Sequence, residues 1–126
     1  MNAPNAPLAS LKLTDPKLLR NKCYVDGQWI DADGGKTLAV TNPATGELLG
    51  TVPSVGAAET RRAIEAANAA WPAWRAKTAK ERSQILRKWA DLMMANQEDL
   101  AVIMTAEQGK PLVESRGEIA YGASFI

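Results

Sequence analysis

Glu107-Gln108-Gly109-Lys110-Pro111 is the stretch that decides how this chain folds. Gly109 suits the left-handed conformation that follows a last helical turn, and Pro111 suits the first position of the next helix. The stretch therefore predicts a junction between two helices. Glu107 is unusual there, because a carboxylate in the last turn faces the negative end of the helix dipole, at a cost of roughly 0.3–1 kcal/mol when exposed. We expect a positive charge near it.

Apolar residues at helical spacing flank the junction on both sides. Residues 97–108 predict the helix before it, and a stripe of Leu112, Ile119, Ala123 and Ile126 predicts the helix after it. Gly117 and Gly122 each weaken that second helix by about 1 kcal/mol relative to Ala, so a close helix crossing is needed to hold it. The chain stops at Ile126 within this pattern. We expect the last helix to lack an ending of its own.

Two further helices are predicted upstream. Residues 57–70 are rich in Ala and other strong helix formers, and we expect Trp71-Pro72-Ala73-Trp74 to break that helix. Thr78 with Glu81 three residues later is a capping box that opens the next helix. The second helix carries an apolar stripe that we expect to lie on a core: Ile85, Trp89, Leu92 and Met93.

Before the helices, turn residues separate four short apolar runs. Asp26-Gly27 predicts a hairpin that joins residues 23–25 to 28–30. A turn over residues 42–46 joins residues 37–41 to 48–52, and Pro53 ends the last strand. The fold expected is α+β, with two β-hairpins followed by four helices over residues 21–126. Residues 1–20 are expected to form a disordered or loosely attached tail.

The composition excludes several classes of function. Fifteen basic and fourteen acidic residues give a net charge of +1 without a basic stripe, so nucleic acid is not expected as a partner. Without His and with one Cys, the chain lacks the residues of a zinc site or of a Ser-His or Cys-His nucleophile. No apolar run approaches the roughly 20 residues that span a bilayer, so no membrane partner is expected. Since Cys23 cannot form an internal disulfide, a cytoplasmic location is the expectation.

Glu107 is the best candidate for a functional side chain. Its carboxylate and the carbonyls at the helix end would form a negative, all-oxygen spot that suits a hard cation. The alternative is a solvated side chain or a weak pair with Lys110. Cys23 is expected to be a small buried hydrophobe rather than a reactive thiol, because neither a helix N-terminus nor an imidazole is near it in sequence. Arg61 and Arg62 are expected on a solvated helix face rather than in an anion site.

Three stretches in this order resemble the N-terminal part of the NAD(P)-dependent aldehyde dehydrogenase superfamily. They are Tyr24-Val25-Asp26-Gly27-Gln28-Trp29, Asn42-Pro43-Ala44-Thr45-Gly46-Glu47 and Glu107-Gln108-Gly109-Lys110-Pro111. Within the superfamily the chain is most similar to succinate-semialdehyde dehydrogenases, on residues 71–82, 92–94 and 117–126. Glutarate-semialdehyde dehydrogenases and other aldehyde dehydrogenases remain alternatives.

The resemblance implies the oxidation of a small-molecule aldehyde to its acid with NAD or NADP. It implies that residues 21–126 are the N-terminal portion of an incomplete cofactor-binding domain of the α/β aldehyde dehydrogenase fold, stopping within a helix. The family's catalytic cysteine, general-base glutamate, oxyanion-hole asparagine and dinucleotide loops would all lie beyond Ile126, and Cys23 does not match the family nucleophile. The chain alone is therefore expected to be inactive, and the full-length parent to be a homo-oligomer.

Two site assignments follow from the same resemblance. Family structures often hold a monovalent cation between the backbone that precedes the Asn-Pro turn and the acidic residue of the Gly-Lys-Pro motif. Here these would be the carbonyl groups of Val40 or Thr41 and the Glu107 side chain. Tyr121 aligns near the family's substrate tunnel, with a core aromatic as the alternative. A different class of function also stays open, namely a helical interaction module that docks through Ile119, Ala123 and Ile126.

Overall fold

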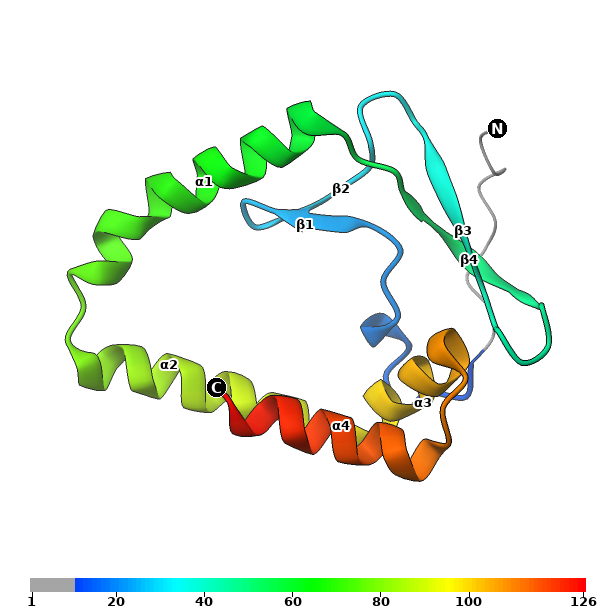
Figure 1. Cartoon of the computed structure of the whole chain (residues 1–126). Coiled ribbons are helices and arrows are strands. Elements are labelled where there is room, and N and C mark those ends of the chain that lie inside the picture. The colour runs from blue at the N-terminus through cyan, green and yellow to red at the C-terminus, as the bar shows by residue number, and fades with distance from the viewer. Residues whose placement is uncertain (1–10) are drawn as a thin grey trace.

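The computed structural model describes residues 11–126, which form two β-hairpins followed by four α-helices. The expected α+β order is confirmed. In Figure 1, α1 runs along the top and α2 and α4 run along the bottom; the β1–β2 hairpin lies beneath α1, and the β3–β4 hairpin descends on the right. No helix in this part of the chain combines the length and apolar character that crossing a bilayer demands. The elements are η1 (Pro16–Leu18), β1 (Cys23–Val25), β2 (Gln28–Ile30), β3 (Thr37–Thr41), β4 (Leu48–Pro53), α1 (Ala57–Arg75), α2 (Ala79–Ala95), α3 (Gln97–Gln108) and α4 (Leu112–Ser124).

The first hairpin has the predicted turn. β1 and β2 pair antiparallel with Cys23 opposite Ile30, and the two loop residues Asp26 and Gly27 both have positive φ, at 49° and 75°. Such a two-residue turn twists in the same sense as the strands that it joins. The Asp-Gly pair therefore fixes the register of this hairpin locally.

The second hairpin contains an irregularity that the sequence reading did not include. Val40 lies opposite Gly50 but Thr41 lies opposite Leu48, so Leu49 is an extra residue in β4. This is a β-bulge, which disrupts the ladder and bends the strand. The predicted turn is present: Gly46 has a φ of 74°, and the Asn42 side-chain oxygen accepts a hydrogen bond from the Ala44 N–H at 2.9 Å.

The prediction that residues 71–74 break the first helix is wrong. α1 continues through Pro72 to Arg75, and the Ala76 N–H donates to the Pro72 carbonyl at 3.2 Å. Proline removes the hydrogen bond to the carbonyl four residues earlier. Because Trp71 beside it is 53% exposed, water can reach this side of the helix and solvate the freed group. The helix ends within one further turn.

α2 begins as predicted but packs differently. Thr78 and Glu81 form the capping box, with the Thr78 N–H donating to the Glu81 carboxylate at 2.7 Å. The expectation that the apolar stripe lies on a core is wrong for most of it, because Ile85, Trp89 and Leu92 are 47%, 56% and 53% exposed. Periodicity identifies the apolar face of a helix, whereas burial depends on which element covers that face.

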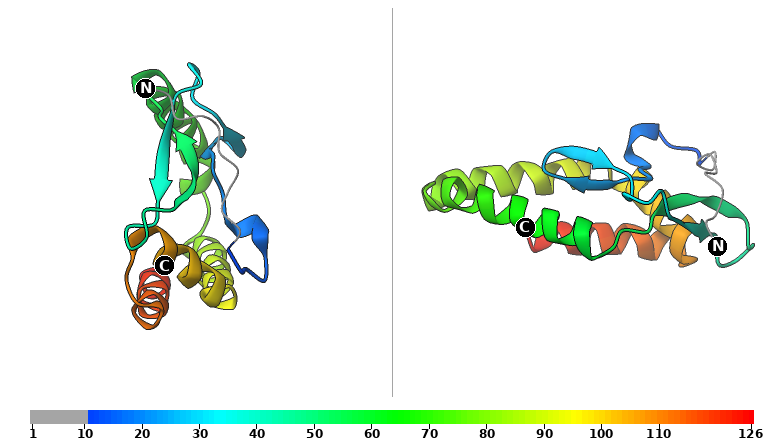
Figure 2. Two further views of the ribbon diagram at one scale, coloured as in Figure 1. Left: turned by 90° about the vertical axis from the view of Figure 1, so that its right-hand side faces the viewer. Right: turned by 90° about the horizontal axis from the view of Figure 1, so that it is seen from above.

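α3 and α4 form the tightly packed pair of the structure. Ala101 and Ser115 are fully buried between them, and the Ser115 and Thr105 hydroxyl groups hydrogen-bond at 2.8 Å. Gly109 takes the left-handed conformation expected at the junction, with φ of 79°. α4 runs to Ser124, and Phe125 after it keeps right-handed helical φ and ψ of −90° and −8°. Figure 2 shows α4 lying alongside α2, and a Cβ added at Gly122 would lie 3.7 Å from the Met93 methyl carbon.

This packing also removes the proposed docking face of α4. Ile119 and Ala123, which were expected to bind a partner in the interaction-module hypothesis, are each only 8% exposed. The two side chains face the neighbouring helices because α4 packs against both α2 and α3. The hypothesis is wrong for this face.

The N-terminal segment is attached to α3. The first half of the predicted tail, residues 1–10, lies outside the described residues. From residue 11 onward the chain forms η1, and the backbone N–H groups of Thr14 and Asp15 donate to the Asp99 carboxylate at 2.8 and 2.7 Å. The expectation of a loose tail over residues 1–20 did not include this contact.

Candidate functional site

Two of the motif stretches meet in space. A Cβ added at Gly109 would lie 2.8 Å from Pro43 Cγ, so the ring of the Asn-Pro turn rests directly on the junction between α3 and α4. Glycine is needed at this position both for its positive φ and for this close approach. The contact places Glu107, in the last turn of α3, beside the bulged strands β3 and β4.

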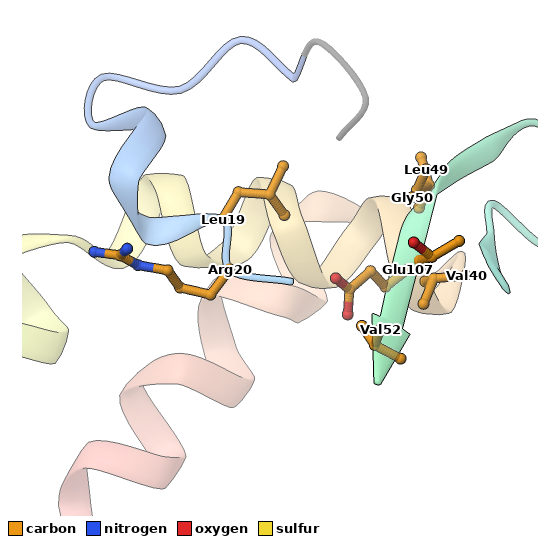
Figure 3. A pocket seen from close by; sticks show the side chains of 8 residues that line it. Leu19, Arg20, Val40, Leu49, Gly50, Val52 and Glu107 are labelled. Atoms are coloured by element: carbon orange, nitrogen blue, oxygen red, sulfur yellow. The ribbon is translucent and has the colours of Figure 1, made fainter. Parts of the chain in front are cut away.

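Glu107 faces a small pocket between three parts of the chain. Figure 3 shows its carboxylate between β4 and the segment that carries Leu19 and Arg20. The cavity measures about 20 Å³, which is enough for one water molecule or one monovalent ion. Its lining residues are Leu19, Arg20, Val40, Leu49, Gly50, Thr51, Val52 and Glu107.

Residues 11–126 supply no partner for the Glu107 carboxylate. The pair with Lys110 that was left open is not formed, because the Lys110 ammonium instead contacts Glu118 at 2.7 Å. Arg20 lines the same pocket, but its guanidinium points away from Glu107 and lies over the Trp29 ring, 4.9 Å from the centroid. This part of the chain therefore does not provide the positive charge expected near Glu107. Glu107 is itself exposed, so the alternative of a solvated side chain stays open beside that of a cation site.

Thr51, another of the lining residues, has an unsatisfied hydroxyl group. Thr51 is only 2% exposed, and its Oγ1 has no hydrogen-bond partner among the described residues. Leaving a buried hydroxyl unpaired costs roughly 1–3 kcal/mol. Thr51 was not predicted as a site residue. The signal in the sequence is Gly50 beside it, because a glycine inside a strand indicates a bulge.

The bulge decides which of the predicted backbone ligands reaches the pocket. Val40 lines it, whereas Thr41 is exposed and is not among the lining residues. A bulge leaves backbone groups of the extra residue without ladder partners. The structure thus brings Glu107 and Val40 together and places Thr41 at the edge of the site.

The pocket has oxygen ligands of the kind that a hard cation prefers. Its lining residues include one with a carboxylate, Glu107, and one with a hydroxyl group, Thr51, next to a bulged strand. Residues 11–126 contain no cluster of three or more His, Cys, Asp or Glu side chains that could hold a metal ion.

Tyr121 lies away from this pocket. Its side chain is 64% exposed and packs edge to face against Phe125, with ring centroids 4.7 Å apart. Among the described residues Tyr121 is therefore not part of a core. Cys23, on β1, is half-buried.

Two buried carboxylates outside the pocket tie distant segments together. Glu59, 8% exposed, accepts hydrogen bonds from the N–H groups of Asp33 and Gly56, each at 3.0 Å. Both hydrogen bonds lower the pKa of Glu59, and the bond from the Asp33 N–H has the larger effect. The N–H groups of Asp15 and Thr14 likewise lower the pKa of Asp99. Both carboxylates hold loop backbone against a helix.

Arg62 is paired rather than merely solvated. Its guanidinium donates to both oxygens of Asp33, each at 2.7 Å. The pKa of Asp33 is lowered, mainly by this hydrogen bond. The expectation of a solvated face for Arg62 missed the ion pair because its partner lies in a distant loop.

The chain is similar to known proteins over most of its length. A model described as the aldehyde dehydrogenase family matches residues 29–126. The glutarate-semialdehyde dehydrogenase of Pseudomonas aeruginosa is 66% identical over 116 residues, which are 92% of this chain and 24% of that protein. The succinate-semialdehyde dehydrogenase GabD of Escherichia coli is 60% identical over the same share of each chain.

Solved structures agree with the sequence matches. The crystal structure of succinate-semialdehyde dehydrogenase from Burkholderia pseudomallei has a TM-score of 0.89 and 63% identity, and the match covers 90% of this chain and 24% of that one. The chain thus spans about a quarter of the length of the relatives that it matches.

Proposed function

The chain belongs to the aldehyde dehydrogenase family, and from this we propose that it serves in the oxidation of a semialdehyde to its acid by NAD+ or NADP+. The observation that carries the proposal is the similarity, over 92% of the chain, to dehydrogenases named for glutarate and succinate semialdehyde. The preferred substrate in the proposal is succinate semialdehyde, with glutarate semialdehyde as the alternative. A cytoplasmic location and assembly into a homo-oligomer belong to the same proposal.

The role of these residues in that enzyme is to support the site rather than to perform the chemistry. The only cysteine, Cys23, is half-buried on β1 and does not lie beside Glu107 in the pocket. NAD(P)+, when bound, would accept the hydride of the oxidation, and we assign none of residues 11–126 to its binding. What this chain supplies is a fixed pocket at Glu107 and helices with exposed apolar faces, such as that of Ile85 and Trp89 on α2.

An activity assay tests this division of roles. Residues 1–126 alone, mixed with NAD+ or NADP+ and either semialdehyde, should produce no NAD(P)H absorbance at 340 nm. A longer protein that contains this chain should reduce the cofactor with at least one of the two substrates. Turnover by residues 1–126 alone would contradict the supporting role, and inactivity of the longer protein with both substrates would contradict the substrate class.

We further propose that the Glu107 pocket holds a monovalent cation in a longer enzyme that contains this chain, with a further ligand from residues outside it. The Glu107 carboxylate, the backbone carbonyls at Val40 or Thr41 and the Thr51 hydroxyl group would be its ligands. Support comes from the unpaired Glu107 carboxylate, the unsatisfied Thr51 Oγ1 and a cavity of about 20 Å³. A cation there would also offset the unfavourable position of Glu107 at the end of the α3 dipole.

Thermal stability measured against ion concentration tests the cation. An ion that binds only the folded state raises stability as its concentration rises, so K+ or Na+ should raise the melting temperature. Tetramethylammonium, at the same ionic strength, is too large for the pocket and serves as the control. Glu107→Gln and Thr51→Val should each remove the difference between the two salts. An unchanged difference in Glu107→Gln would exclude an ion at this position.

Thr51→Val also distinguishes an empty pocket from an occupied one. In tetramethylammonium chloride the substitution should raise the free energy of unfolding by about 1 kcal/mol, since it removes an unsatisfied buried hydroxyl group. In KCl the gain should shrink, because the wild-type hydroxyl then has a partner. An equal gain in both salts would show that Thr51 does not contact the ion.

Tyr121 is proposed to lie near the substrate path of the longer enzyme. Its support is the exposed position on α4, 64% accessible beside Phe125. Tyr121→Ala should raise KM for the semialdehyde more than KM for the cofactor. The neighbouring Glu118→Gln, on the same helix, is the control, and equal changes in both variants would remove Tyr121 from the substrate path.

A further inference from the structure

Asp99 is a buried carboxylate that the proposed function does not use. It lies in the first turn of α3, is 5% exposed, and accepts hydrogen bonds from two consecutive backbone N–H groups, at Thr14 and Asp15. Hydrogen bonds to a charged acceptor are short and strong, as the lengths of 2.8 and 2.7 Å show here. Because both donors lie next to each other, the pair of bonds fixes the direction of the N-terminal segment as well as its position.

The segment held by Asp99 is stiff between that contact and the Glu107 pocket. Asp15 caps η1 by accepting a hydrogen bond from the Lys17 N–H at 3.0 Å, and Pro16 has a restricted φ at the start of the turn. The Leu19 N–H then bonds to the Pro16 carbonyl at 3.3 Å. Leu19 and Arg20 follow directly and line the pocket on the side away from β4. One short helical turn thus connects the Asp99 contact rigidly to the pocket wall.

α3 is the common frame for both sides of the pocket. It carries Asp99 near its beginning and Glu107 near its end, which are eight residues and about 12 Å apart along a helix. Because Asp99 and Glu107 share one rigid element, a segment anchored at Asp99 reaches Glu107 at a fixed distance. β4 completes the pocket through the contact of the Asn42–Gly46 turn with Gly109.

We propose that Asp99 is a positioning residue, which holds Leu19 and Arg20 as the N-terminal wall of the Glu107 pocket. This wall is defined by the geometry of the chain alone. Its effect on ion affinity rests on the cation proposed above. Without Asp99, the segment from residue 14 to residue 20 would move away from α3, and the pocket would open to solvent on that side.

Hydrogen exchange of the protein at its natural length tests the wall directly. In Asp99→Asn, amides of residues 14–20 should exchange at least about tenfold faster than in the wild type, because one of the two hydrogen bonds and the charge are lost. Asp99→Ala, which removes both bonds, should show a larger increase. Amides of α4 around Ser115 should keep their wild-type rates. Glu98→Gln, which disrupts the exposed pair with Arg116, is the matched control and should leave residues 14–20 unchanged.

Thr14→Pro tests the same contact from the other side, since proline lacks the N–H that donates to Asp99. It applies even if substitutions at the buried Asp99 prevent folding. Amides of residues 17–20 should again exchange faster in this variant. Wild-type exchange rates at residues 14–20 in Asp99→Asn, or at residues 17–20 in Thr14→Pro, would overturn the proposal.

The ion titration supplies a readout that a merely structural role would not change. In Asp99→Asn the K+ concentration for half of the stabilisation should rise about tenfold relative to Glu98→Gln. Equal midpoints in the two variants would show that the wall does not affect the pocket. If the wild type shows no K+ dependence, the cation proposal fails, and the exchange rates alone decide whether Asp99 positions the wall.

Discussion

α1 and α2 differ from α3 and α4 in what their side chains contact. α2 has no buried residue, and the only buried residue of α1 is Glu59 at its start. α3 and α4 bury Ala101, Ser115, Ile119 and Ala123, which are mostly small, so the two helices approach closely. α1 and α2 are the longer helices and carry many large apolar side chains, yet most of these are exposed. Length and amphipathic character thus do not decide which helices form the core of this chain.

The difference arises from the ends of the helices as well as from their faces. The α3–α4 junction is fixed by Gly109 under Pro43, and α3 is fixed at its start by Asp99. At the opposite side of the molecule, α1 and α2 are joined by a connection in which Lys77 donates to the Trp74 carbonyl at 3.2 Å. α3, which is tied to other segments near both of its ends, is thus the helix against which α4 packs.

The largest expected effect is that of Gly109→Ala. A left-handed conformation costs an L-residue roughly 1–2 kcal/mol, and the new Cβ would lie 2.8 Å from Pro43 Cγ, an overlap that costs about 1–3 kcal/mol more. Urea unfolding measures the total loss. Gly46→Ala is the matched control, since Gly46 has a φ of 74° but nothing within 4 Å of an added Cβ. Equal losses in the two variants would show that the contact with Pro43 does not contribute.

Ser115→Ala should have the next largest effect. It removes the hydroxyl group that pairs with Thr105 at 2.8 Å inside the α3–α4 interface, and leaving Thr105 unpaired should lower the free energy of unfolding by about 1–3 kcal/mol. Thr105→Val combined with Ser115→Ala removes both partners and should recover part of the loss. A double variant that loses the sum of the two single losses would contradict a direct bond between these side chains.

A smaller, pH-dependent effect is expected at Glu59, which ties α1 to the loop at Asp33. Its pKa in the folded protein lies below the ordinary value of 4.5, so the ionised form is stabilised by folding. The stabilisation is fully present above that ordinary value and is lost as the pH falls through the lowered folded-state pKa. Glu59→Gln should therefore lower the melting temperature at pH 7 and flatten its decline in acid.

Glu65→Gln is the control for this measurement, because Glu65 is an exposed carboxylate on the same helix. Its melting temperature should follow the wild-type pH profile. If Glu59→Gln shows the same acid decline as the wild type, other carboxylates, such as Asp99, account for that decline.

The features that could be predicted from the sequence are those set by neighbouring residues. Asp26-Gly27, the Thr78 and Glu81 capping box and Gly109 each fix a turn or a helix end through their own φ or side chain. The order of two hairpins and four helices follows from them. The path of α1 through Pro72 could not be predicted, because it depends on solvent exposure along that helix.

The candidate site was only partly predictable, because it depends on strand register and on tertiary contacts. Glu107 and Val40 could be paired from their motifs, but a bulge shifts the strand register at this point and leaves Thr41 outside the lining. Thr51 and Arg20 enter the pocket through tertiary contacts that join segments far apart in sequence. Asp99 is an ordinary acidic residue in the first turn of a helix until Thr14 is placed against it.

The smallest effect is expected for Ile85→Ala on α2. Ile85 is 47% exposed, so its truncation should change the free energy of unfolding of residues 1–126 by no more than about 0.5 kcal/mol. Ile119→Ala on α4 is the matched control: the same side chain, 8% exposed, should cost about 2–5 kcal/mol. A loss above 1 kcal/mol for Ile85→Ala would show that α2 packs as α4 does. If Ile85→Ala leaves the stability of residues 1–126 unchanged but costs at least about 2 kcal/mol in a longer dehydrogenase, the apolar face of α2 is a contact surface for the rest of that enzyme.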